Sequence, residues 1–131
     1  MDNKYLTLFR EIARNTEIMA ERVMAYDKEK KDEKGEKTAQ TMRDDFAKLH
    51  DKFAAKDFNP DTITRSEWAK ILVGAMVISN NLEEEVKKIK NAQRGYKIDL
   101  IPKLNRIMEE TKTDEEALTL ANELFEISEN K

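Results

Sequence analysis

Apolar residues along the first thirty positions recur in steps of four and three residues. The series comprises Tyr5, Phe9, Ile12, Thr16, Met19, Val23 and Tyr26, with the threonine as its one polar member. This spacing places the side chains in one stripe along a helix that packs lengthwise against another helix. We therefore expect a long helix over about residues 1–31, whose stripe is either bundle core or a contact with a partner chain.

A second pattern runs from residue 68 to residue 78, where every side chain except Lys70 is apolar or glycine. A helix that is apolar all round its circumference is normally surrounded by other elements. The apolar positions continue at helical spacing as far as Ile89. The pattern thus predicts a second long helix over about residues 64–94, at the centre of the fold. Each long helix would measure roughly 45 Å at 1.5 Å per residue.

Three further helices complete the expected fold. One is predicted over about 38–56, and another begins near Asp99, with Pro102 tolerated in its first turn. The last is an acidic helix over about 114–128, which opens with a capping box from Thr113 to Glu116. Between the first two helices, residues 28–37 carry no apolar side chain and form either a solvated helix end that stops at Gly35 or a mobile connection. The sequence predicts an all-α bundle of four to five helices.

Length and composition agree with one helical domain over residues 1–131. The chain has no cysteine, so it forms no disulfide, which agrees with a reducing compartment. The N-terminus lacks the layout of a signal peptide, and the longest apolar run is too short to cross a bilayer. We expect a soluble, cytoplasmic protein with no membrane partner.

The segment from Asp57 to Glu67 has two interpretations. In the first, it is a turn followed by a helix start, in which Thr64 caps the helix and Glu67 closes a capping box. In the second, it resembles a degenerate EF-hand calcium loop, with Asp57, Asn59, Asp61 and Glu67 as the candidate ligands, and the alternative function is then that of a calcium-responsive module. The loop lacks the glycine at its sixth position, and its glutamate stands at the eleventh position instead of the twelfth. These departures favour the capping interpretation.

Charge is segregated in the last third of the chain. Residues 87–106 hold seven basic side chains and one acidic side chain, whereas residues 107–131 hold eight acidic and two basic ones. The basic stretch could follow a phosphate backbone, which makes a nucleic-acid-associated accessory protein an alternative function. Equal and opposite charges so close in sequence favour instead a pairing of the two stretches, in one chain or between neighbours.

The functional expectation is a non-enzymatic helical protein that acts by protein–protein contact, as an adaptor or a small inhibitor. No activated nucleophile, metal cage or phosphate-binding loop can be assembled from these residues, so we expect no catalytic site and no cofactor. The expected partner is another protein, a further copy of the chain, or both. The candidate contact residues are Met19, Val23, Tyr26, Lys87, Lys88, Lys90, Arg94 and Lys97.

Overall fold

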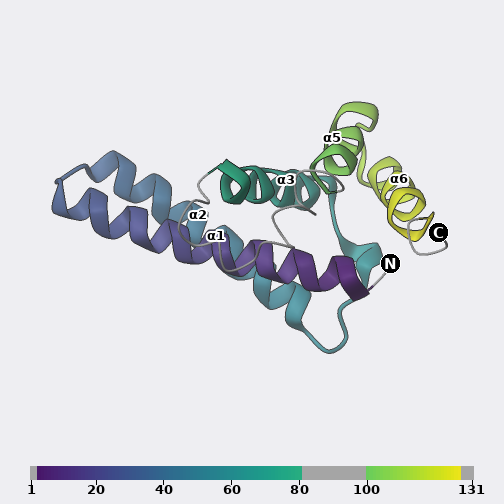
Figure 1. The fold of residues 1–131 in the computed structure, drawn as a ribbon, viewed down its shortest axis with the longest axis horizontal. Coiled ribbons are helices and arrows are strands. Elements are labelled where there is room, and N and C mark those ends of the chain that lie inside the picture. Colours follow the sequence, from purple (N-terminus) through teal and green to yellow (C-terminus); the bar gives the residue numbers. More distant parts are fainter. Residues whose placement is uncertain (1–2, 81–99, 128–131) are drawn as a thin grey trace.

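The computed structural model describes residues 3–80 and 100–127, and the regular secondary structure in these ranges is entirely helical. The elements are α1 (Asn3–Glu29), α2 (Glu33–Ala54), the short 3-10 helix η1 (Pro60–Thr62), α3 (Arg65–Asn80), α5 (Ile101–Glu110) and α6 (Asp114–Ile127). The prediction of an all-α bundle is therefore confirmed. Figure 1 shows α1 and α2 as a long antiparallel hairpin, with α3 lying along it and with α5 and α6 beyond one end of α3.

The turn between α1 and α2 is much shorter than the sequence predicts. Only residues 30–32 separate the two helices, so most of the charged segment 28–37 is helical. The amides of Lys31 and Asp32 donate back to the carbonyls of Lys28 and Asp27, at 3.1 and 2.8 Å, which is the Schellman pattern of a helix end. Lys31 takes the left-handed conformation of that motif, with φ of 58°. Two hydrogen bonds thus fix the reversal of the chain.

The prediction that Gly35 stops the first helix is wrong, because Gly35 lies in the first turn of α2. Asp32 is the N-cap of that helix, and its carboxylate accepts a hydrogen bond from the Gly35 amide at 3.0 Å. Acidic residues at Glu33 and Glu36 also favour a helix start here, because the N-terminal end of a helix carries a partial positive charge. The second helix therefore begins five residues earlier than the predicted range of 38–56, and it ends at Ala54.

α3 has the central position expected of it, although it is not enclosed on every side. Trp68, Ile71 and Ile78 are fully buried, whereas Val73 and Met76 are 46% and 44% exposed. The described part of the predicted helix 64–94 ends at Asn80, and residues 81–94 lie outside the described residues. The two long helices that pack together in the described structure are α1 and α2.

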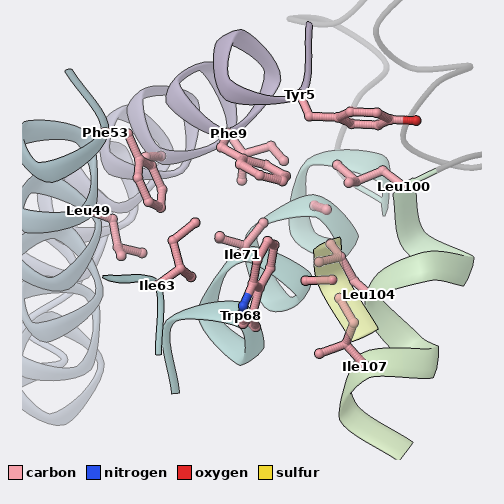
Figure 2. Close-up of a cluster of buried hydrophobic side chains, with 14 of the residues drawn as sticks. Tyr5, Phe9, Leu49, Phe53, Ile63, Trp68, Ile71, Leu100, Leu104 and Ile107 are labelled. Atoms are coloured by element: carbon pink, nitrogen blue, oxygen red, sulfur yellow. The ribbon is translucent and has the colours of Figure 1, made fainter. Parts of the chain in front are cut away.

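The core gathers side chains from all five helices into one cluster. Its aromatic centre is Trp68. This ring stacks on Phe125 of α6 and meets Phe9 of α1 edge-on, and in both pairs the ring centres are 5.5 Å apart. Figure 2 shows Phe53 and Phe9 on one side of Trp68, with Leu104 of α5 on another side. Packed aromatic pairs of this kind add to the stabilisation from burial alone. They join the α1–α2 hairpin to the C-terminal helices.

Arg65, the first residue of α3, ties this helix to the junction of α5 and α6. Its guanidinium donates to the carbonyls of Met108 and Thr111, at 3.0 and 3.1 Å. Its own backbone amide donates to the Asp114 carboxylate at 2.8 Å. Arg65 thus satisfies carbonyls at the end of α5, while Asp114 satisfies an amide at the start of α3. This reciprocal capping orients α5 and α6 against the rest of the fold.

Candidate interaction surface

The apolar stripe of α1 is buried over its first half and exposed over its second half. Phe9, Ile12 and Thr16 are fully buried, but Val23 is 49% exposed and Tyr26 is 60% exposed. Figure 1 shows the end of the α1–α2 hairpin extending beyond the described part of α3. The stripe keeps its four-and-three spacing from the buried half into the exposed half. Exposed apolar side chains that continue a buried stripe are typical of a contact surface.

Beside this exposed stripe lies an apolar groove, which we call the hairpin groove. Its volume is about 540 Å³. Met19, Ala20, Val23, Ala39, Met42 and Val77 form its apolar walls, and Asp27, Asp32, Lys34, Gly35 and Thr38 form the remainder. The walls come from α1, α2 and the last turns of α3. Methionine side chains adapt their shape easily, and surfaces rich in them accept varied apolar partners.

The hairpin groove is joined by a second hollow of about 520 Å³ between α2 and α3. Thr38 and Met42 line both of them, and the exposed Val73 lines the second. Together they follow α2 from Gly35 to Phe46, a length of about 17 Å at 1.5 Å per residue. This length corresponds to about three turns of a helix that could lie in the groove.

Gly74 of α3 lies close to both long helices. A Cβ atom at this position would lie 2.8 Å from Ile12 of α1, 2.8 Å from Phe46 of α2 and 3.0 Å from the Thr16 hydroxyl. Only a glycine permits this approach of three helices without displacing a neighbour. This close approach lets α3 pack directly against both long helices.

Two of the candidate calcium ligands, Asn59 and Glu67, cap helices in the structure. The Glu67 carboxylate accepts a hydrogen bond from the Thr64 amide at 2.9 Å, and the Thr64 hydroxyl accepts one from the Glu67 amide at 3.1 Å. The predicted capping box is therefore confirmed. The same carboxylate oxygen is paired with the Lys52 ammonium group at 2.6 Å. Asn59 accepts a hydrogen bond from the Asp61 amide at 3.0 Å and caps η1.

A cation already occupies the position that a calcium ion would need at Glu67. Over residues 3–80 and 100–127, no three acidic, histidine or cysteine side chains lie close enough to hold a metal ion. The side chains of Asp57 and Asp61 are exposed. The geometry of this loop therefore favours helix capping over metal binding.

The charged C-terminal third is described only in part. Lys87, Lys88, Lys90, Arg94 and Lys97 lie outside the described residues. Of the basic stretch, Lys103 donates to the Tyr5 hydroxyl at 2.7 Å, and Arg106 pairs with Glu110 at 2.7 Å. The hydrogen bond from Arg106 holds the pKa of Glu110 below its usual value, and the same bond raises the pKa of Arg106. In this described portion, each of the two basic side chains bonds within its own chain.

Comparisons with protein-family models, with curated proteins and with solved structures find no match to this chain. Among the helices that the structure describes, none is both long enough and apolar enough to cross a membrane.

Proposed function

We propose that this protein is a non-enzymatic helical interaction protein that acts by binding the surface of another protein. The single observation that supports this most is the emergence of the α1 stripe from the core, with Val23 and Tyr26 exposed beside the hairpin groove. Exposed apolar side chains gathered beside an apolar hollow are typical of protein-binding surfaces. Adaptors and small inhibitors work by such contacts.

The exposed side chains can supply a useful part of a binding free energy. Full burial of a tyrosine side chain removes about 150–250 Å² of its surface from water. Each Å² of apolar surface buried contributes about 25 cal/mol of free energy. Because 60% of Tyr26 is exposed, covering it would contribute roughly 3 kcal/mol. Covering the exposed half of Val23 would add roughly 1 kcal/mol. These two residues are therefore the best candidates for strong contributions to the interface.

The test compares captured proteins for three forms of the tagged chain. The contact variant combines Val23→Lys with Tyr26→Lys, because both side chains are largely exposed and the folded chain should tolerate lysine there. The control is Ala25→Lys, an exposed position about 200° round the same helix from Val23. We expect a near-stoichiometric partner to be captured by the wild type and the control but not by the contact variant.

Circular dichroism and thermal unfolding establish that the contact variant is folded. A folded contact variant that retains every partner would show that the exposed stripe is not the binding surface. Capture that disappears after nuclease treatment or falls steeply with salt would instead support nucleic-acid association through the basic stretch, since such binding is strongest at low salt.

A further inference from the structure

The chain carries both halves of a helix-in-groove interface. One half is the hairpin groove, with its apolar walls from α1, α2 and α3. The other half is the end of α1, where the half-buried Met19 and the exposed Val23 and Tyr26 stand at positions i, i+4 and i+7. This spacing is that of the anchor residues by which an amphipathic helix binds in an apolar groove. The groove and a helix of the matching pattern thus occur on one face of the same molecule.

We infer that the occupant of the hairpin groove is the exposed end of α1 from a second copy of this chain, so that two hairpins form a symmetric dimer. This inference rests on the proposed function, because it takes the hairpin groove to be a binding surface. In a two-fold interface the same patch serves both subunits, so residues of one stripe can line their own groove and enter the groove of the partner copy. Met19 and Val23, which belong to both features, fit this double role.

The exposed half of the hairpin and the outer side of α3 together approach the area that a stable dimer needs. α1 has 27 residues and is about 40 Å long, and two helices side by side are about 20 Å wide. The whole face of the hairpin therefore measures roughly 800 Å², and the half next to the turn, where the α1 stripe is exposed, measures roughly 400 Å². Each partner contributes about 800 Å² to an interface of standard size, so the outer side of α3 must supply the rest. α3 covers part of this face, but it presents Val73 and Met76 as exposed apolar side chains.

The charges at the end of the hairpin permit two copies to meet. Residues 27–37 contain five acidic and five basic side chains, so this segment has no net charge. Two such segments that approach each other do not suffer the repulsion that like-charged surfaces would cause. In its lack of net charge, this segment differs from the basic and acidic stretches of the C-terminal third.

The first test is the oligomeric state, measured by sedimentation velocity up to about 1 mM, where even weak dimers are populated. We expect the wild type and Ala25→Lys to dimerise. The double variant Val23→Lys, Tyr26→Lys should weaken the dimer by roughly tenfold or more, because a lysine ammonium group loses its hydration in an apolar interface. A wild type that stays monomeric, or a dimer that the double variant leaves unchanged, would overturn the inference.

The second test uses disulfide formation, because the chain has no cysteine of its own. Val23→Cys lies on the proposed interface, where it meets the same region of the partner copy. Ala25→Cys lies on the opposite side of α1. Mild oxidation should give a covalent dimer for the first variant and little for the second. Equal crosslinking of both, or of neither, contradicts the proposed arrangement.

Alkylation of Val23→Cys identifies another occupant if the inference fails. A monomer in which this thiol is shielded from the reagent would place residues of its own chain over the groove. Failure of the inference is distinguishable from failure of the proposed function. A monomeric wild type whose captured partner is lost with Val23→Lys, Tyr26→Lys leaves the proposed function standing and removes only the dimer.

Discussion

The replacement of Gly74 by alanine tests the packing that holds the three long elements together. Gly74 lies inside α3, where it approaches α1 and α2 at once. A Cβ atom there would lie 2.8 Å from the Ile12 methyl, 2.8 Å from the Phe46 ring and 3.0 Å from the Thr16 hydroxyl. Real Cβ atoms essentially never approach a neighbour more closely than 3.0 Å. Because these neighbours are buried and belong to two helices, no single small rotation relieves all three contacts.

Two effects of opposite sign decide the magnitude. Alanine inside a helix is favoured over glycine by about 1 kcal/mol, so an unobstructed site would gain stability. Insertion of an extra carbon into a well-packed core costs about 1–3 kcal/mol. Three simultaneous contacts place Gly74→Ala at the upper end of that cost. The expected net result is a loss of about 2 kcal/mol, or a melting temperature lower by about 8 °C for a chain of this size.

The assay is urea unfolding followed by circular dichroism, with Gly35→Ala as the matched control. A Cβ at Gly35 would meet carboxylate oxygens of Asp27 and Asp32 at 2.7 Å, but these are terminal atoms of side chains near the surface, which can turn away at the expense of the Asp32 cap. We expect Gly35→Ala to stay within about 0.5 kcal/mol of the wild type, since the helix preference offsets a weakened cap. A Gly74→Ala variant that is as stable as the wild type, or more stable, would refute the close approach of the three helices.

Three further predictions concern the turn, the junction of α5 and α6, and a surface ion pair. Lys31→Gly should raise the unfolding free energy by about 0.5–1 kcal/mol in urea titration, because glycine adopts the left-handed conformation without strain. Arg65→Ala should lower it by about 2–3 kcal/mol, since two carbonyls lose a charged donor, and Arg65→Lys should recover less than half of that loss. The lowered pKa of Glu110 means that its bond with Arg106 stabilises the fold above the unfolded-state pKa. That contribution is lost as the pH falls through the folded-state pKa. Below about pH 5, the melting temperature of Arg106→Met should therefore decrease slightly less with falling pH than that of the wild type.

The elements that local patterns could predict are those with a repeating spacing or a reciprocal cap. The stripe from Tyr5 to Tyr26 predicted α1 to within two residues at each end. The Thr64–Glu67 spacing predicted the start of α3, because both hydrogen bonds of a capping box are set within four residues. Such features depend on local geometry alone, and the sequence therefore contains nearly all of the information that they need.

The features that the sequence did not reveal depend on contacts between distant residues or on a rare backbone conformation. A lysine in the left-handed region has no local sequence signal, whereas the nearby Gly35 is the residue type that normally ends a helix. Asp32 followed by an acidic first turn was the available sign of a helix start. The capping of α5 by Arg65 joins residues more than forty positions apart. The sequence also could not predict at which residue the α1 stripe changes from buried to exposed, because this depends on the position of α3.

Trp68 allows the two interpretations of the loop before α3 to be separated by fluorescence. It is the only tryptophan, it is fully buried, and it directly follows Glu67. Lys52 at 2.6 Å and the Thr64 amide at 2.9 Å both hold the same oxygen of the Glu67 carboxylate, so a calcium ion bound to both carboxylate oxygens would have to break both bonds. We therefore expect no change in Trp68 emission up to millimolar calcium. Lys52→Met removes the competing cation, so a saturable change in the wild type that strengthens in this variant would mean that the carboxylate is a metal ligand and that its role in capping is secondary.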